Sequence, residues 1–397
     1  MRWDSLRLDS SDGHEHHHER GHGEAAAGYV ALPLIERGAV SRTFDTPEFR
    51  GMTFYEVQAK SIVSEVPKSS RMMFRYTVNP YRGCTHACRY CFARNSHTYL
   101  DLDAGRDFDT KVVVKVNAPQ LLRAKLASPG WRGEHIAMGT NVDCYQRAEG
   151  RYRLMPGIIG ALRDARNPFS ILTKGTLILR DLDLLRSAAE VTDVGLNVSA
   201  AFTDESLWRA IEPGTPAPER RLEACAALND AGLRCGVLMG PVVPFLSDSP
   251  AQLAAAVRGA AAAGAPHVTP IVLHLRPGAR EWFLGWLREA HPELVPRYAE
   301  LYGPGAYARK DYQARIAGQV RELAERLGVG RETGRSGRSG RPARRDQAPP
   351  SVPAPARDRV EPARPAPPAG RVALSEQAAP ADPAPPAVSS HQQLTLL

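Results

Sequence analysis

The 397-residue sequence lacks a long hydrophobic run. No apolar stretch reaches the roughly 18 to 20 residues that a helix needs to span a bilayer. The first residues, MRWDSLRLDSSDGHEHHHERGHG, also contain no apolar segment that could serve as a signal peptide. We therefore expect neither a membrane-spanning nor a secreted protein, and a cytoplasmic location follows.

Cysteine is scarce as well, with six residues in the whole chain. Thiols stay reduced in the cytoplasm, so six cysteines in so long a chain do not suggest a framework of disulfides. Three of them nevertheless fall within NPYRGCTHACRYCFAR, as Cys84, Cys88 and Cys91. Such a close group of thiols indicates a metal site. We interpret Cys225 and Cys235 as core residues, because they lie in a predicted helix and at the start of a predicted strand.

A strong basic charge is missing from the centre of the chain. The net charge is +8, but residues 331–397 contain ten Arg against six Asp or Glu and so account for +4 of it. The rest of the chain is only mildly basic, which is weak support for nucleic-acid binding.

Residues that build a core are also scarce at both ends of the chain. Residues 1–27 are polar and contain five His; such tracts bind metal in some proteins, but a flexible arm is the simpler interpretation. Residues 331–397 are mostly Pro, Ala, Arg and Gly, which cannot bury enough apolar surface to offset the entropy lost on ordering. We predict a disordered tail there, an N-terminal segment that packs on the core over 28–73, and the core with C-terminal helices over 74–330.

Between the ends, short β-branched runs alternate with helical patterns. The strand candidates are residues 74–80, 135–141, 169–175, 193–200, 234–244 and 267–275. The helix candidates between them are residues 154–166, 182–190, 218–232 and 250–264, and the last two end in the C-cap residues Gly232 and Gly264. Parallel strands need crossover helices, so this alternation predicts an α/β fold, a partial (β/α)6 barrel. Residues 112–116 form an extra strand outside the main series.

The three clustered cysteines follow the first predicted strand with the spacing C-x3-C-x2-C. Thiolates are soft ligands that suit zinc or iron–sulfur clusters. A cluster of four irons normally takes four cysteines, so three ligands in one loop leave one iron open to a substrate or cofactor. A structural zinc site completed by His86 or His97 is the alternative, and three unrelated buried cysteines are a weaker one.

The segment CTHACRYC resembles the radical S-adenosylmethionine (radical SAM) superfamily, whose motif is C-x3-C-x-aromatic-C. The resemblance implies that Cys84, Cys88 and Cys91 hold a 4Fe–4S cluster, and that S-adenosylmethionine chelates the fourth iron. It also implies reductive cleavage of the cofactor to a 5′-deoxyadenosyl radical. A reductant such as flavodoxin or ferredoxin would supply the electron for this cleavage. Tyr90, the aromatic residue of the motif, would lie near the adenine or the cluster.

Further segments resemble the spore photoproduct lyase-like branch, also described as DNA repair photolyase-like. They are GTNVDCYQRAEG (139–150), ILTKGTLILRD (171–181), LNVSAAF (196–202) and IEPGTPAPERRLEA (211–224). This resemblance makes DNA or another nucleic acid one candidate substrate, with a peptide or a small molecule as the alternatives.

Single residues in these segments also acquire expected roles from the resemblance. It implies that Thr140, Asn141, Lys174 and Ser199 contact S-adenosylmethionine. A compact ammonium such as that of Lys174 suits the methionine carboxylate. The same segments contain two carboxylates, Asp143 and Glu149. For these two residues a structural role is at least as good an interpretation as a functional one.

The chain departs from the branch at the residues before Thr140. Spore photoproduct lyase carries a hydrogen-atom donor cysteine there, whereas this chain has Met138 and Gly139. The departure argues against thymine-dimer repair. Cys144 is a candidate displaced donor or redox thiol, against the alternative of a chance replacement of the proline that relatives tend to carry.

The last residues, HQQLTLL, break the polar composition of the tail. They resemble the peptide with which bacterial DNA repair proteins dock on the replicative sliding clamp. The resemblance implies that Leu394, Leu396 and Leu397 fill an apolar groove and that Gln393 bonds at its edge. Five residues are a short signal, and an accidental match is the alternative.

These patterns favour a radical SAM enzyme that abstracts hydrogen from an unidentified substrate, with a nucleic acid in repair as one class. The alternative is a zinc- or cluster-stabilised nucleic-acid-binding protein without catalysis. That alternative lacks its expected features, a second cysteine pair or a basic stripe with interleaved aromatic residues.

Overall fold

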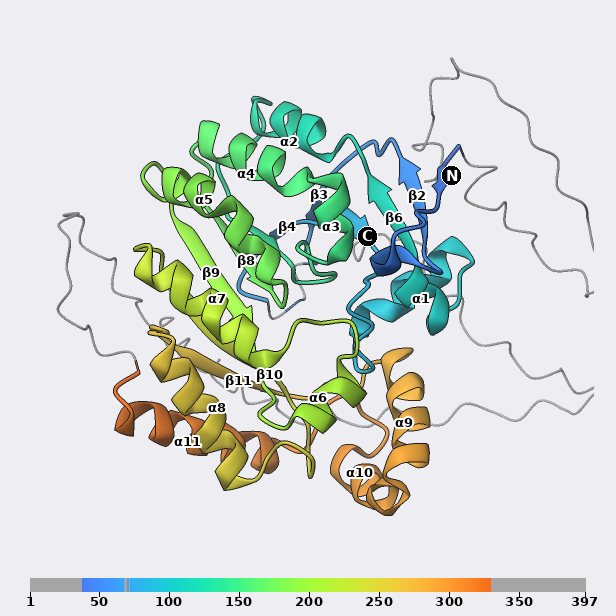
Figure 1. The fold of residues 1–397 in the computed structure, drawn as a ribbon, viewed down its shortest axis with the longest axis vertical. Helices are drawn as coiled ribbons and strands as arrows, with labels where there is room; N and C mark the ends of the chain where they lie inside the picture. The colour runs from blue at the N-terminus through green and yellow to red at the C-terminus, as the bar shows by residue number, and fades with distance from the viewer. Residues whose placement is uncertain (1–37, 68–69, 71, 330–397) are drawn as a thin grey trace, which may run out of the picture. The chain divides into compact units, whose positions relative to one another are not determined.

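A twisted, mostly parallel sheet forms the centre of the computed structural model, which describes residues 38–67, 70 and 72–329 (Figure 1). Within this part, the sheet has seven strands in the order β11-β10-β9-β8-β7-β4-β3. Its parallel strands are β4 (Tyr76–Val78), β7 (Ile136–Met138), β8 (Phe169–Thr173), β9 (Val194–Ser199), β10 (Cys235–Val242) and β11 (Val268–Val272). The short β3 (Val63–Glu65) pairs antiparallel with β4 at one edge. The six parallel strands confirm the predicted partial barrel.

Helices connect the consecutive parallel strands, and most of them form an outer row on one side of the sheet (Figure 1). They are α2 (Ala118–Leu126), α3 (Arg147–Tyr152), α4 (Leu154–Asp164), α5 (Leu182–Ala189), α6 (Glu205–Ile211), α7 (Pro218–Asp230) and α8 (Pro250–Ala262). The α7 and α8 helices end as predicted, because Gly232 (φ 83°) and Gly264 (φ 68°) adopt the left-handed conformation that glycine favours. Four of these helices, α4, α5, α7 and α8, are the ones the sequence predicts.

A second sheet lies outside the series of parallel strands. In the described part of the chain it has four strands in the order β1-β2-β6-β5. These are β1 (Val40–Arg42), β2 (Thr53–Val57), β6 (Lys111–Lys115) and β5 (Tyr81–Arg82). The extra strand predicted over 112–116 is therefore confirmed as β6, one residue earlier. Phe54 and Val112 from its neighbouring strands are buried in the main core, which ties this sheet to the rest of the fold.

Helices also follow the last parallel strand. They are α9 (Ala279–Ala290), α10 (Val295–Tyr302) and α11 (Lys310–Arg326), with the short α1 (Arg106–Thr110) before β6. Short 3₁₀ turns complete the elements: η1 (Pro47–Phe49), η2 (Phe92–Ser96), η3 (Thr98–Leu100), η4 (Thr176–Asp181) and η5 (Pro292–Leu294). In α11, Tyr312, Ile316 and Val320 recur at helical spacing and are buried. No helix in the described part of the chain is long and apolar enough to cross a membrane.

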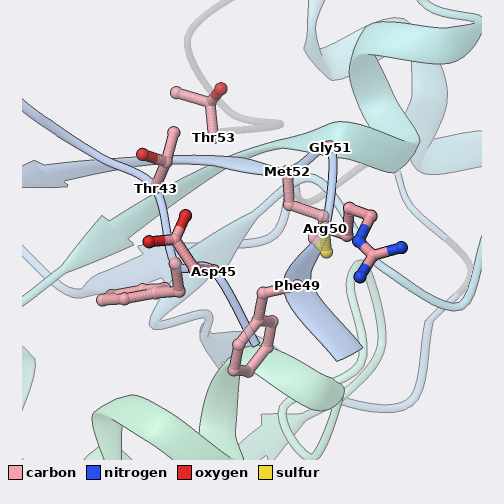
Figure 2. Close-up of a pocket in the computed structure, with 8 residues that line it drawn as sticks. Thr43, Asp45, Phe49, Arg50, Gly51, Met52 and Thr53 are labelled. Carbon is pink, nitrogen blue, oxygen red and sulfur yellow. The ribbon is translucent and has the colours of Figure 1, made fainter. Parts of the chain in front are cut away.

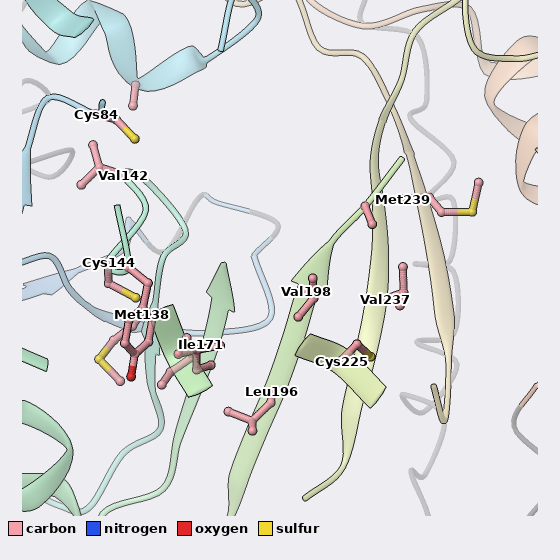
Figure 3. Close-up of a cluster of buried hydrophobic side chains, with 14 of the residues drawn as sticks. Cys84, Met138, Val142, Cys144, Ile171, Leu196, Val198, Cys225, Val237 and Met239 are labelled. Atoms are coloured by element: carbon pink, nitrogen blue, oxygen red, sulfur yellow. The ribbon is translucent and has the colours of Figure 1, made fainter. Parts of the chain in front are cut away.

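Side chains from successive strands meet in one hydrophobic core (Figure 3). Met138 on β7, Ile171 on β8 and Val237 on β10 are almost fully buried there. Cys225 and Cys235 are fully buried in the same core, which confirms the prediction that they are core residues. The residues predicted as a flexible arm (1–27) and as a disordered tail (331–397), with the terminal motif Gln393, Leu394, Leu396 and Leu397, lie outside the described residues.

Candidate active site

The cysteine loop runs from Gly83 at the end of β5 to Cys91 at the start of η2. The side chains of Cys84 and Cys88 are buried and that of Cys91 is half-buried. Two tight turns space the thiols, since the amide of Ala87 donates to the Cys84 carbonyl at 3.2 Å and the amide of Cys91 donates to the Cys88 carbonyl at 3.2 Å.

Gln146, from the loop after β7, fixes the first half of the cysteine loop. Its side-chain oxygen accepts from the Thr85 amide at 3.0 Å, and its side-chain nitrogen donates to the Gly83 carbonyl at 2.9 Å. Gly214 closes the loop from the other side: its amide donates to the His86 carbonyl at 3.1 Å, and a Cβ there would lie 2.1 Å from the Thr85 oxygen. The loop is therefore held by two segments that follow different strands.

A buried carboxylate, Glu212, joins the cysteine loop to the strand ends. One of its oxygens accepts a short hydrogen bond from the Tyr90 hydroxyl, and the other pairs with the Arg221 guanidinium at 2.5 Å. The Lys174 ammonium lies 3.8 Å from the oxygen that Tyr90 contacts. Burial alone would raise the pKa of Glu212, but Arg221, Lys174 and the Tyr90 hydroxyl together hold it below its ordinary value. Glu212 is therefore ionised and sits at the centre of a charged network.

Lys174, at the end of β8, and Ser199, at the end of β9, face each other. The ammonium donates to the Ser199 hydroxyl at 2.9 Å, and that hydroxyl donates to the Gly240 carbonyl on β10 at 2.9 Å. The same ammonium lies 5.8 Å from the centre of the Tyr90 ring. The structure thus brings together three of the five residues predicted to bind the cofactor, Tyr90, Lys174 and Ser199. The other two, Thr140 and Asn141, lie half-buried just after β7.

The carboxylates of Asp143 and Glu149 hold the backbone of this region. Asp143 accepts from the Thr173 hydroxyl at 2.6 Å and from the Lys174 amide at 2.6 Å. Glu149 is fully buried, and it accepts from the Leu154 amide at 3.0 Å and from Arg180 at 2.6 Å. Both carboxylates are therefore structural, and Asp143 sets the backbone from which Lys174 projects.

Cys144 lies in the hydrophobic core, near Met138 (Figure 3). Its side chain is almost fully buried, and burial raises the pKa of its thiol well above the ordinary value. Gly139, directly after β7, leaves no room for a side chain, because its φ is 75° and a Cβ would lie 1.8 Å from the Leu172 oxygen. The backbone at Gly139 therefore has no room for any side chain, a cysteine included.

Exposed aromatic rings and a cation lie beside the cysteine loop. Phe92 directly follows Cys91, and its ring, 41% exposed, lies 5.1 Å from the guanidinium of Arg276, which follows β11. Arg276 also donates to the hydroxyl of Tyr307 at 3.4 Å, and Tyr307 is 50% exposed. The ring of His274 meets that of Tyr307 at 4.7 Å. We call these four residues the Phe92–Arg276 cluster.

A separate hollow of about 310 Å³ lies near β1 and β2 (Figure 2). Thr43, Phe44, Asp45, Phe49, Arg50, Gly51, Met52 and Thr53 line it. None of the predicted site residues is among them, so the hollow is distinct from the site built around the cysteine loop.

Known proteins resemble the chain in both sequence and fold. The family model for the radical SAM superfamily matches residues 78–256. The uncharacterized protein Rv2578c of Mycobacterium tuberculosis is 52% identical over 293 residues, which cover 74% of this chain and 86% of that protein. The chain belongs to the radical SAM superfamily. The uncharacterized protein MJ0683 of Methanocaldococcus jannaschii is 33% identical over 174 residues, 44% of this chain and 62% of that protein.

The fold also matches solved radical SAM structures. Spore photoproduct lyase complexed with dinucleoside spore photoproduct superposes with a TM-score of 0.53 at 15% identity, covering 70% of this chain and 80% of that one. A double mutant of the same lyase, with bound AdoMet and dinucleoside spore photoproduct, gives 0.51 at 16% identity over 66% and 77% of the two chains. These structural matches confirm the predicted fold, which the chain shares with spore photoproduct lyase.

As a radical SAM enzyme, the protein uses a 4Fe–4S cluster and S-adenosylmethionine and needs a reductant. The superfamily match therefore decides against the non-catalytic alternative. The donor atoms of the cysteine loop fit the cluster, since Cys84, Cys88 and Cys91 offer three soft thiols on one short loop.

Each histidine of the zinc alternative has one ring nitrogen engaged elsewhere. The Nδ1 atom of His86 lies 3.5 Å from an Asp143 oxygen, and the Nε2 atom of His97 lies 2.8 Å from the Lys111 carbonyl. Among residues 38–67, 70 and 72–329, no three His, Cys, Asp or Glu side chains gather closely enough to hold one metal ion.

Proposed function

We propose that Cys84, Cys88 and Cys91 hold the cluster of this radical SAM enzyme, and that Tyr90, Thr140, Asn141, Lys174 and Ser199 bind S-adenosylmethionine. One observation carries the proposal: the cysteine loop and the ends of β8 and β9 converge on Glu212, which contacts Tyr90 and Lys174 together. Residues that bind one cofactor must lie close together in this way. Residues whose only role is to make local bonds at the end of a strand need not do so.

Each residue of this network has a physical task toward the cofactor. When bound, the cluster and S-adenosylmethionine supply a 5′-deoxyadenosyl radical that removes a hydrogen atom from the substrate. Lys174 offers a positive charge to the methionine carboxylate, and Ser199 holds its ammonium at 2.9 Å, in place before the carboxylate arrives. The ring of Tyr90, half-buried and packed against the core, excludes water beside the cysteines.

Iron and sulfide analysis of cysteine variants tests the ligand assignment. The chain is purified and reconstituted without oxygen, and Cys84, Cys88 and Cys91 are each replaced by alanine. Cys225→Ala is the control, because Cys225 is also a buried cysteine but packs in the core. We expect about four irons and four sulfides per chain in wild type and in the control, and a loss of most of both in each loop variant. Full occupancy in Cys88→Ala contradicts the assignment.

We further propose that the substrate is a nucleic acid with an accessible base. The support is the Phe92–Arg276 cluster, because exposed rings stack on bases and an arginine pairs with phosphate. Its position beside Cys91 puts it next to the proposed cofactor site. Spore photoproduct lyase, which has the same fold, has been solved with dinucleoside spore photoproduct.

Binding of a fluorescent single-stranded oligonucleotide, followed by anisotropy, tests the substrate class. Arg276→Gln should weaken binding roughly tenfold, as loss of a charge-assisted hydrogen bond does. The control is Arg220→Gln, an exposed arginine on α7 that pairs with Glu223. Equal affinity of the two variants, or no saturable binding by wild type, refutes a nucleic-acid substrate bound at this cluster.

DNA repair by lyase chemistry is a more specific version of this proposal. Such a repair reaction would need another hydrogen donor than the one expected for thymine-dimer repair. Gly139 has no space for a side chain. Cys144 stays a predicted donor, although its thiol is buried in the core. A Cys144→Ala variant with full turnover removes it as the donor.

We also propose, from sequence alone, that Gln393, Leu394, Leu396 and Leu397 dock on a replicative sliding clamp. These residues lie outside the described residues, and the support is the Gln-Leu-x-Leu-Leu pattern at the end of a polar tail. A labelled peptide of residues 385–397 should bind the clamp saturably, and the same peptide with Leu396 and Leu397 changed to alanine should not. Equal binding of the two peptides rejects the motif.

A further inference from the structure

Arg94 is a fully buried arginine three residues beyond Cys91, in the turn η2. Its Nε and Nη2 atoms both donate to the carbonyl of Cys88, at 3.1 and 3.0 Å. Its Nη1 atom donates to the carbonyl of Gly105 at 2.8 Å. One guanidinium therefore ties the middle of the cysteine loop to the segment that precedes α1.

The surroundings of Arg94 balance its charge and hold its guanidinium in place. Nη2 also pairs with the carboxylate of Asp109 at 2.8 Å, and the guanidinium carbon lies 5.2 Å from the centre of the Phe108 ring and 4.9 Å from that of Trp282. A buried charge is costly unless it is paired and hydrogen-bonded, and here every guanidinium nitrogen has an acceptor. The planar guanidinium of Arg94 can donate several hydrogen bonds in this fixed geometry, and the ammonium of a lysine could not reproduce them.

We propose that Arg94 is a positioning residue for the iron–sulfur cluster: it fixes the turn between Cys88 and Cys91 and, with Asp109, sets the charge beside the cluster. This inference rests on the proposed cysteine ligands. Hydrogen bonds and net charge around a cluster set its reduction potential, and a positive charge favours the state that has gained an electron. Arg94 raises the potential, and Asp109 lowers it.

Two substitutions with opposite expected signs test the charge effect. The reduction potential of the cluster is measured by electron paramagnetic resonance during a redox titration of the reconstituted chain. Arg94→Gln removes the positive charge and should shift the potential to more negative values. Asp109→Asn leaves the guanidinium unbalanced and should shift it to more positive values. The control is Arg220→Gln, because Arg220 is an exposed arginine on α7 that pairs with Glu223; it should leave the potential unchanged.

A third variant separates position from charge. Arg94→Lys keeps the charge but cannot make both bonds to the Cys88 carbonyl, so it should keep a potential near that of wild type while holding less iron and sulfide per chain. Wild-type iron content in this variant overturns the positioning role. If Arg94→Gln does not fold, Asp109→Asn alone decides the charge effect, because a negative or absent shift contradicts it.

The outcome also distinguishes this inference from the assignment on which it rests. If Cys88→Ala retains the cluster, the cysteine ligands are wrong and Arg94 has no cluster to tune. If Cys88→Ala loses the cluster while Arg94→Gln and Asp109→Asn leave the potential unchanged, the ligands stand and only the role of Arg94 is refuted.

Discussion

Replacing Glu212 by glutamine removes the one negative charge that Tyr90, Lys174 and Arg221 share. Glu212 and Arg221 are each about 1% exposed, so solvent cannot replace the lost carboxylate. Arg221 would keep its bonds to the carbonyls of Pro216 and Ser199 but would be left as a buried cation without its counter-charge.

The expected cost follows from this burial. Breaking a buried ion pair by removing one partner destabilises proteins by about 3 to 5 kcal/mol. Glutamine keeps the shape and one acceptor oxygen, so we expect Glu212→Gln to lower the free energy of unfolding by about 3 kcal/mol. The assay is urea unfolding of the reduced, metal-free chain, followed by tryptophan fluorescence at about pH 7.5.

A surface pair provides the matched control for Glu212→Gln. Glu205 pairs with Arg209 at 2.6 Å on the exposed side of α6, and pairs of this kind contribute about 0.3 to 0.5 kcal/mol. Glu205→Gln should therefore be almost neutral. A difference of less than about 1 kcal/mol between the two variants would refute the reasoning, because it would mean that the carboxylate is not what stabilises the buried cations.

Three further predictions concern single residues around the site. Lys174→Gln should raise the dissociation constant for S-adenosylmethionine, measured by calorimetry, about 10- to 100-fold, as loss of a charged hydrogen bond does; Lys125→Gln on α2 is the control, and equal affinities count against Lys174 as a ligand. Gly139→Ala should destabilise the chain more than Gly133→Ala, because both have positive φ but only Gly139 would place a Cβ against Leu172; equal unfolding midpoints contradict this. Burial lowers the pKa of His97 to about 4. The unfolded chain, with a histidine pKa near about 6.5, therefore binds more protons as the pH falls below that value. His97 should thus cost about 2 kcal/mol of stability between about pH 8 and pH 5, and His97→Gln should reduce the pH dependence by that amount. If the stability of His97→Gln depends on pH as strongly as that of wild type, the lowered pKa of His97 is rejected.

Much of the central fold is predictable from the sequence, because its signals are local. Strands such as β8 and β9 are short β-branched runs, and α7 and α8 each end at a glycine that leaves the helix. The second sheet is less accessible, since β2 pairs with β6 across more than fifty residues and no local pattern encodes that partner. No range is predicted for α11, although its buried residues recur at regular helical spacing, a signal that was available.

The candidate active site also has some features that the sequence predicts and others that it does not. The cysteine spacing marks the loop, and strand ends mark Lys174 and Ser199, because parallel strands end at the same edge of a sheet. The central role of Glu212 is not predictable, because it depends on contacts with Lys174 and Tyr90. These two residues lie 38 and 122 positions before Glu212 in the sequence. The role of Arg94 is not predictable for the same reason. An arginine after a metal motif is expected at the surface, and only its packing against Phe108 and Trp282 shows that it is buried.

The measurement that tests the central claim most directly is the formation of 5′-deoxyadenosine. The reconstituted chain is reduced with dithionite in the absence of oxygen and incubated with S-adenosylmethionine, and the product is quantified by liquid chromatography. Wild type and the Cys225→Ala control should both form 5′-deoxyadenosine, and Cys88→Ala should form none above background. Equal amounts from wild type and Cys88→Ala would contradict the account, because the cysteine loop would then have no part in cleaving the cofactor.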